Sequence, residues 1–380
     1  MNLIRYVGLL RSPASWAAVG RGLVPALRDA GRHVCVVERK GFLYDPAFAL
    51  PEGLAELCRD RREARLDLAF LHPRLYGELR APVRAGMLTW EASAMPGSWA
   101  RAVEKNLHVL FVPSPFVEEA ARKAGVARVP IHVVPYGVDA RVFHPGALAF
   151  TWPELLARGA VVLGDAAVDL EGRFAFLTVG APHHRKGILE VAEGYARAFR
   201  REDRVLLVVK TSYVPEERKG GALAFEVRDL AGKIGKILAG SGLPAVFFRG
   251  VLSDAEQARL YRTAQAYVCA SFGEGFGLSV LEAKACGVPV LATLWGGVAS
   301  FSTDADTWAI PYSLEDAREK QYDDAAGALV ARPDVGGIAS AMRAVLEARE
   351  PARRARVERG LEVAKGFGWA RCAREVIARL

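Results

Sequence analysis

Two carboxylates at a fixed spacing, beside a run of glycines, carry the clearest chemical signal in the chain. Glu274 and Glu282 lie in the stretch 271–293, in which three glycines at alternate positions come before a short helical pattern. An apolar run precedes the glycines, and a second one follows the helical pattern. This order of signals predicts a strand, a loop, a helix and a further strand.

The glycines predict an anion site at the start of this helix. Residues without side chains let backbone N–H groups approach a ligand, and a helix N-terminus adds the positive end of its dipole. Phosphate is the most suitable anionic ligand. The two carboxylates beside it suit hydroxyl groups, so a ligand with both a phosphate and a sugar, such as a nucleotide sugar, is indicated. A structural alternative is that Ser279 and Glu282 form a capping box, in which Glu282 only bonds the backbone.

The spacing of Glu274 and Glu282 inside EGFGLSVLEA resembles the E-x7-E motif of the retaining GT-B glycosyltransferases of family 4, also called glycosyltransferase group 1. A second match lies at residues 112–145, where V-P-S-x-F-V-x-x-A and then V-V-P-Y-G-V-D-x-x-x-F-x-P resemble the end of the first domain in that family. The resemblance covers most of the chain and is weakest at 12–75 and 300–330. It implies an α/β GT-B architecture, with two Rossmann-like doubly wound parallel-sheet domains facing each other across a cleft.

The resemblance also implies a function. It predicts a metal-independent enzyme without a cofactor that moves a hexose from a UDP- or GDP-sugar to an acceptor hydroxyl on a glycan, a lipid-linked compound or a small molecule. Glu274 would then hold hydroxyl groups of the donor sugar, and Glu282 would bind the ribose. Lys186, which follows the first strand of the second domain, would stabilise the leaving diphosphate together with Arg185.

This chain departs from the family pattern at several of the expected site positions. The family usually has an arginine where this chain has Ala181, so Arg185 and Lys210 are the candidates to replace that cation. Glu91 stands where relatives often have a histidine, and either an acceptor-side role or a structural one fits it. The paired glycines of the first loop are missing, which leaves Gly8 as the close-approach position to the donor.

Further donor contacts are expected from backbone groups. These positions are Gly275, Phe276, Gly277 and Leu278 at the helix start, and Arg249 and Val251 in a loop that would contact the base.

Composition limits the other classes of protein. A chain of 380 residues, 51% apolar and 25% charged, is typical of a soluble globular protein with two domains. The net charge of +8 fits anionic ligands or a membrane surface, but it is too small, and too weakly interleaved with aromatic residues, for a nucleic-acid-binding protein.

Cysteine and histidine usage predicts neither disulfides nor a metal site. The five cysteines are scattered without paired spacing, which indicates buried thiols in a reducing cytoplasm. His183 and His184 have no complementary ligand cluster in the sequence. No signal-peptide pattern or bilayer span is evident, so any membrane contact would be peripheral, at the inner face. The oligomeric state is not indicated.

Alternating strand and helix patterns must position these residues. The first domain (1–160) is expected on the acceptor side, the second (161–365) would bind the nucleotide sugar, and the resemblance implies a terminal helix (366–380) that returns toward the first domain. Expected strands are 3–10, 33–38, 66–71, 85–89, 108–112, 131–134, 174–179, 204–209, 245–248, 266–270 and one near 290. Expected helices are 16–30 with an interruption at Pro25, 54–64, 116–124, 152–157 in a linker, 188–200, 223–239, 254–264, 335–346, 353–365 and 367–380.

Other functions share the two-domain plan and remain open on sequence alone. They are a sugar phosphorylase, a nucleotide-sugar epimerase, and a catalytically silent subunit that binds nucleotide sugar. The alanine at position 181 is the feature that keeps the silent subunit in consideration.

Overall fold

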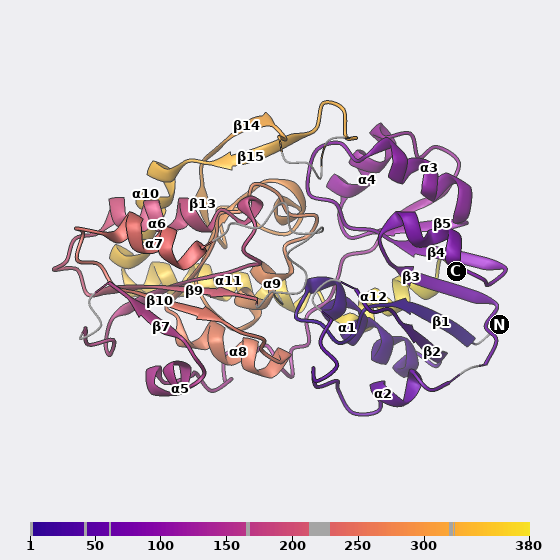
Figure 1. Cartoon of the computed structure of the whole chain (residues 1–380), viewed down its shortest axis with the longest axis horizontal. Coiled ribbons are helices and arrows are strands. Elements are labelled where there is room, and N and C mark those ends of the chain that lie inside the picture. The colour runs from indigo at the N-terminus through magenta and orange to yellow at the C-terminus, as the bar shows by residue number, and fades with distance from the viewer. Residues whose placement is uncertain are drawn as a thin grey trace.

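The computed structural model contains two sheets with helices packed on their faces, one in each half of the chain (Figure 1). It describes residues 3–41, 44–60, 62–164, 168–212, 229–318, 322 and 324–380. The strand order is β2-β1-β3-β4-β5-β6 in the first sheet and β13-β12-β11-β8-β9-β10-β7 in the second. The chain therefore has two Rossmann-like domains of the α/β class, as the sequence predicted.

The first sheet is parallel throughout. Helices cover both of its faces, so its strands bury side chains on both sides and show continuous apolar runs in the sequence. The bounds are β1 (Leu3–Gly8), β2 (His33–Glu38), β3 (Leu66–Phe70), β4 (Val83–Met87), β5 (Val109–Val112) and β6 (Ile131–Val133). Each of these strands lies close to its predicted range.

The helices of the first domain differ more from the prediction. Helix α1 (Ser15–Asp29) runs through Pro25 without interruption, and α3 (Gly97–Asn106) was not predicted. The helix predicted at 54–64 is wrong beyond its first turn, because α2 spans only Leu54–Leu57. In the segment that follows, the Asp60 side chain accepts a hydrogen bond from the Arg62 backbone N–H, and such local bonds compete with helix formation. Helix α4 (Pro115–Lys123) begins at the Ser114 cap, as expected.

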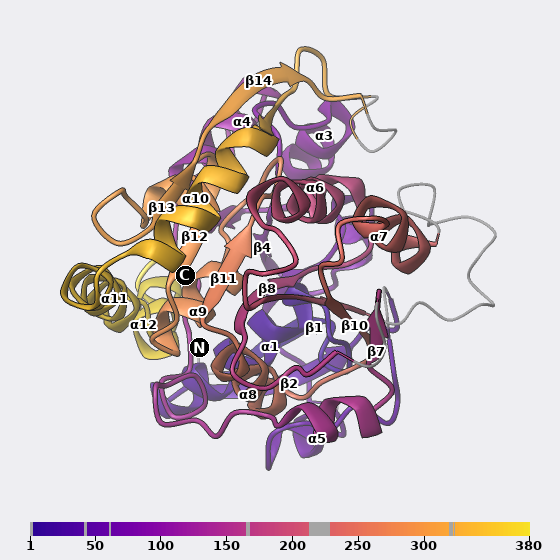
Figure 2. The same ribbon diagram turned by 90° about the vertical axis from the view of Figure 1, so that its left-hand side faces the viewer.

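The second sheet is parallel except at one edge, where β7 (Val161–Leu163) runs antiparallel to β10 (Ala245–Arg249). Figure 2 shows α6, α7 and α10 on one side of this sheet and α8 and α9 on the other. The remaining bounds are β8 (Phe174–Val179), β9 (Val205–Thr211), β11 (Ala266–Cys269), β12 (Val290–Thr293), β13 (Trp308–Ile310), α6 (Ile188–Ala198), α7 (Leu230–Leu238), α8 (Asp254–Thr263), α9 (Leu278–Ala285) and α10 (Val335–Glu347). Part of the helix predicted at 223–239 lies outside the described residues.

A hairpin of β14 (Tyr312–Asp316) and β15 (Leu329–Pro333) was not predicted. It extends from the second domain to α3 and α4 of the first (Figure 1). There the Ser93 N–H donates to the Leu329 backbone oxygen at 3.0 Å, and the Trp90 and Tyr322 rings pack edge to face with centroids 5.5 Å apart. The hairpin thus gives the two domains a contact outside the linker.

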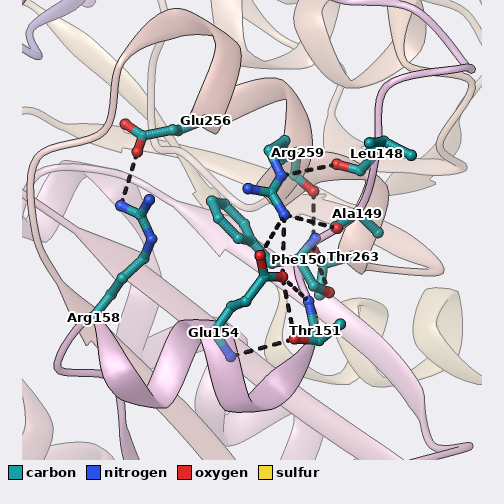
Figure 3. Close-up of polar contacts among 9 residues, drawn as sticks. All are labelled: Leu148, Ala149, Phe150, Thr151, Glu154, Arg158, Glu256, Arg259 and Thr263. Atoms are coloured by element: carbon teal, nitrogen blue, oxygen red, sulfur yellow. Dashed lines mark hydrogen bonds and ion pairs between the residues drawn. The ribbon is translucent and has the colours of Figure 1, made fainter.

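The linker is attached to the second domain by polar contacts (Figure 3). Helix α5 (Trp152–Ala157) starts with a Thr151–Glu154 capping box, and Glu154 also pairs with Arg259 of α8 at 2.9 Å. The Arg259 guanidinium lies over the Phe150 ring, 4.0 Å from its centroid. Residues 148–154 therefore pack against α8 of the second domain.

The chain ends with α11 (Glu350–Lys365) and α12 (Trp369–Ile377). Helix α12 lies among elements of the first domain in Figure 1 and contacts α1. A Cβ at Gly22 of α1 would lie 2.1 Å from the Trp369 ring, so the glycine allows the two helices to approach closely.

Candidate functional site

A cavity of about 410 Å³ lies between the two domains. Its walls come largely from residues at or just beyond the carboxyl ends of β1, β3, β4 and β6 in the first domain and β8, β9, β10 and β11 in the second. The carboxyl ends of parallel strands are where open α/β sheets bind ligands. Among the predicted site residues, those that line the cavity are Glu91, Arg185, Lys186, Lys210, Glu274, Phe276, Leu278 and Glu282.

Glu274 lies at the centre of a charged cluster in the second-domain wall. Its Oε1 accepts hydrogen bonds from Lys186 Nζ at 2.5 Å and Ser271 Oγ at 2.7 Å, and Arg185 Nη1 lies 3.6 Å from the same oxygen. Burial by itself would raise the pKa of Glu274, but the charges of Lys186 and Arg185 and the hydrogen bonds lower it to about 2. Glu274 is therefore ionised at neutral pH and holds both cations beside it.

Arg185 connects this cluster to the first domain. Its Nη1 donates to the Gly273 backbone oxygen at 2.6 Å, and its Nη2 lies 3.2 Å from Oε1 of Glu91, which follows β4. The guanidinium thus spans the gap between the two walls. Arg185 therefore lies near two carboxylates, Glu91 of the first domain and Glu274 of the second. Of these two carboxylates, Lys186 contacts only Glu274.

Two more ionisable groups lie in the same wall, the buried Lys210 and the half-buried Glu282. Glu282 Oε2 accepts a hydrogen bond from the Tyr261 hydroxyl at 2.9 Å. Burial raises the pKa of Glu282 to about 8, and burial lowers the pKa of Lys210 to about 8. Each charge favours the ionised form of the other, so the protonation of this pair responds to what binds in the cavity.

The capping-box alternative for Glu282 is wrong. Helix α9 begins at Leu278, with Gly277 as the cap residue and no side-chain capping bond. The third residue of the helix is Val280, whereas a capping box needs the glutamate at that position. The Glu282 carboxylate lies in the second turn, on the side that lines the cavity.

The glycine loop packs against the first domain. A Cβ at Gly273 would lie 1.9 Å from the Glu91 backbone oxygen, and one at Gly275 would lie 2.4 Å from Thr89 Cγ2. Ser114 Oγ also donates to the Gly275 backbone oxygen at 2.7 Å. The contact between the domains therefore requires both glycines, whereas the sequence suggested that they face an anion.

Gly277 and Leu278 form the transition from the loop into α9. Gly277 has a φ of 97°, in the left-handed region that glycine adopts without strain. The first turn of α9, at Leu278 and Ser279, lines the cavity. The positive end of the α9 dipole is therefore available to an anion there.

Gly8, Arg249 and Val251 do not line the cavity. A Cβ at Gly8 would lie 2.8 Å from the Tyr6 hydroxyl oxygen, so its close approach is to the core of its own domain. Arg249, the last residue of β10, and Val251 in the loop that follows are both exposed. The residues that reach the cavity at these two places are the neighbouring Leu9 and Leu252.

An ion pair between the two walls was missed by the sequence analysis. Arg21, buried in α1, pairs with Asp254 at the start of α8 through bonds of 2.7 and 3.0 Å. Its Nη1 also donates to the backbone oxygens of Leu10 and Ser12, each at 2.8 Å. The pair holds the loop after β1 against the second domain. Its one signal in the sequence is a basic residue on the apolar face of a helical pattern.

The two histidines near Lys186 have local structural contacts. His183 Nδ1 accepts the Arg185 backbone N–H at 3.1 Å, and His184 Nε2 lies 3.8 Å from a Glu190 oxygen. In the described part of the chain, no group of three or more His, Cys, Asp or Glu residues is placed to hold a metal ion. Over the same residues, no helix is long and apolar enough to cross a membrane.

Comparison with known proteins adds a family match and a set of relatives. The family model described as "Glycosyl transferases group 1" matches residues 168–360, just over half of the chain. A D-inositol 3-phosphate glycosyltransferase from Arthrobacter sp. (strain FB24) is 31% identical over 250 residues, which cover 64% of this chain and 48% of the relative. The chain spans about half, or less, of the length of the curated relatives it matches.

Two solved structures share the whole fold. A sucrose-phosphate synthase from Thermosynechococcus elongatus has a TM-score of 0.66 at 19% identity, with all of both chains covered. HepE of Anabaena, solved in complex with UDP-glucose, has a TM-score of 0.68 at 14% identity, again with all of both chains covered. At this level of identity the likeness shows the fold.

Proposed function

Because the chain belongs to the group 1 glycosyl transferases, we propose that it transfers a hexose from a nucleoside-diphosphate sugar to an acceptor hydroxyl, with retention of anomeric configuration and without a metal ion. The observation that carries this proposal is the convergence of Lys186 and Arg185 on Glu274 beside the first turn of α9. Cations and a helix N-terminus suit a diphosphate, and a carboxylate suits sugar hydroxyls. The UDP-glucose bound by the Anabaena neighbour supports a UDP-hexose donor, with a GDP-sugar as the alternative.

Four charged side chains of the second-domain wall have a role in this proposal. The diphosphate would lie between Lys186 and the N-terminus of α9, and the hexose hydroxyls would donate to Glu274. The ribose hydroxyls would donate to Glu282, whose carboxylate lines the same cavity. Lys210, buried opposite Glu282, keeps that carboxylate ionised when a donor is bound.

The chemical step breaks the bond between the anomeric carbon and the leaving phosphate oxygen. A bond from the acceptor oxygen to the same carbon forms on the same face, which retains the configuration, and the acceptor proton passes to the leaving diphosphate. Negative charge grows on the diphosphate during this step. Lys186, Arg185 and the α9 amides are fixed before the reaction, so they can stabilise that charge without reorganising.

The acceptor side is formed by the first domain. Glu91, which contacts Arg185 across the gap, would accept a hydrogen bond from the acceptor hydroxyl. Several of the curated relatives are named D-inositol 3-phosphate glycosyltransferases, and one structural neighbour is named a sucrose-phosphate synthase. These names support a polyol or sugar hydroxyl as the acceptor.

A panel of nucleotide sugars tests the proposal. A true donor should raise the melting temperature, because it binds only the folded state, and it should be consumed when an acceptor mixture is added. NMR of the product then reports the anomeric configuration, and the same assay with a chelator tests metal independence. Release of free sugar phosphate would indicate a phosphorylase, and an altered nucleotide sugar an epimerase. Binding of donor without transfer or hydrolysis would indicate a silent subunit.

A further inference from the structure

Four aromatic rings form a continuous row along the cavity, which we call the aromatic wall: Trp16, Phe70, Tyr136 and Phe276. Trp16 stacks on Phe70 with centroids 5.2 Å apart and planes at 22°. Tyr136 then lies 5.9 Å from Phe70 and 5.4 Å from Phe276. The row therefore runs from the first helix of the first domain to the glycine loop of the second.

The positions of these rings are fixed by their surroundings. Phe70 and Phe276 are buried, and the Tyr136 hydroxyl shares a 2.5 Å hydrogen bond with Thr89 Oγ1. Trp16 is only half-buried, so it keeps an apolar ring face that a ligand in the cavity can cover. A rigid, partly exposed ring is a surface on which flat apolar groups gain binding free energy.

The first-domain part of the cavity offers no spare cation. Among its described lining residues, Arg21 is the one basic side chain, and its guanidinium is bound to Asp254 and to two backbone oxygens. The acidic residue of this wall is Glu91. The N-terminus of α1 also lies here, but a helix end supplies only about half a charge, which is small against a phosphate dianion.

A phosphorylated acceptor would therefore lose hydration beside Glu91 without gaining a charged partner from this wall, and that loss is costly. We propose that the acceptor is an uncharged hydroxyl compound carrying an aryl or alkyl group that packs on Trp16, and not a sugar phosphate. This inference rests on the proposed transferase function and names its acceptor class.

Acceptor competition provides the first test. The full chain, supplied with whichever nucleotide sugar proves to be the donor, is given p-nitrophenyl glucoside, octyl glucoside, methyl glucoside and a hexose phosphate in parallel. We expect the aryl and alkyl glucosides to exceed methyl glucoside in kcat/KM by roughly tenfold, and the hexose phosphate to be the poorest acceptor. A preference for the hexose phosphate overturns the inference but leaves the transferase proposal intact. Failure of every nucleotide sugar to bind overturns both.

Two variants of the first-domain wall sharpen the test. Trp16→Leu keeps an apolar side chain but removes the ring, so KM for p-nitrophenyl glucoside should rise by about tenfold, and that for methyl glucoside by much less. Trp152→Leu is the matched control, because Trp152 lies on α5 and does not line the cavity. Equal losses for both acceptors, or equal effects of both variants, would show that Trp16 is only structural.

Ser15→Lys adds the cation that the wall lacks. Ser15 is exposed at the start of α1 and lines the cavity, so the substitution places an ammonium group near the acceptor without removing a packed side chain. It should raise kcat/KM for the hexose phosphate by about fivefold to tenfold and leave the order of the uncharged acceptors unchanged. No gain for the hexose phosphate would contradict the electrostatic part of the inference.

Discussion

The second-domain wall of the cavity places Lys186, Arg185 and Glu274 in one charged cluster, and Glu282 and Lys210 line the same wall. The first-domain wall is lined mainly by apolar and aromatic side chains, and the charge of its arginine is already matched by Asp254. The two walls therefore suit ligands of different polarity. One is organised for an anion and hydroxyl groups, and the other for an apolar face.

Within the second-domain wall, the two glutamates of the motif also differ. Glu274 has two cations close to its carboxylate, and its pKa is about 2. Burial raises the pKa of Glu282 to about 8, because the hydrogen bond from the Tyr261 hydroxyl and the charge of Lys210 offset only part of the cost of burial. Two residues of one type, close together in sequence, thus have different charges at neutral pH because their neighbours differ.

The largest expected effect follows from breaking the charged cluster of the second-domain wall. Glu274→Ala removes the carboxylate that positions Lys186 and holds the donor sugar, so kcat should fall by roughly a hundredfold or more. Glu358→Ala, a change to an exposed carboxylate on α11, is the control and should leave kcat unchanged. Steady-state kinetics on correctly folded protein measures kcat for both variants. A near-normal kcat for Glu274→Ala would show that Glu274 does not hold the donor sugar.

The next effect concerns the contrast between the two glutamates. Glu282→Gln replaces a charge-assisted hydrogen bond to the ribose with a neutral one, and donor binding should weaken by about 1–3 kcal/mol. Isothermal titration calorimetry with the donor measures this change. If Glu282→Gln binds the donor as tightly as the unchanged protein, the carboxylate does not contact the ribose.

The pH dependence of donor affinity tests the same group. Because burial raises the pKa of Glu282 to about 8, the carboxyl is mostly neutral below that pH, and binding to its ionised form must release a proton. Apparent affinity should therefore rise toward pH 8, by up to about tenfold per pH unit. Above pH 8 it should fall again as Lys210, whose pKa burial lowers to about 8, loses its charge. Glu282→Gln should abolish the rising limb, and a persisting limb would point to another group.

The third effect concerns how the walls are held together. Asp254→Ala leaves the buried Arg21 cation with two backbone oxygens and the Phe48 ring but no anion, whereas Arg21→Met removes the charge and leaves the partly exposed Asp254 to water. Asp254→Ala should therefore destabilise the protein by about 1–3 kcal/mol, and Arg21→Met by less. Calorimetric melting temperatures compare the two variants. If Arg21→Met is the more damaging, the packing of Arg21 matters more than its charge.

The difference between the walls also explains which parts could be predicted. Most strands of both sheets were found because their apolar runs are buried on both faces. Two strands of the second sheet, β7 and β13, were not predicted, because each has only three residues and is too short to show a pattern. The β14 strand was missed because it is a short edge strand with exposed residues such as Leu314. The position of the hairpin depends on its contacts with the first domain. Such contacts do not produce a periodic pattern of apolar residues, so the sequence does not reveal them.

The same reasoning applies to the site residues. Glu274, Glu282 and the start of α9 lie in one short stretch, so local pattern and family resemblance placed them together. Arg21 and Asp254 are 233 positions apart, and their pairing depends on how the two domains dock. Gly273 and Gly275 were recognised as important, but the reason is a domain contact that local sequence does not specify.

The smallest expected effect concerns Glu91, the one carboxylate that reaches from the apolar wall to the charged one. Glu91→Gln keeps the shape of the side chain but loses its charge, so the contact to Arg185, now 3.2 Å, weakens and the acceptor hydroxyl meets a poorer hydrogen-bond partner. KM for the acceptor should rise about threefold to fivefold, as expected for roughly 1 kcal/mol, while KM for the donor changes little. Initial rates with each substrate varied in turn separate the two constants. An effect on the donor KM alone would mean that Glu91 acts through Arg185 on the diphosphate, and the two walls would then share one electrostatic function.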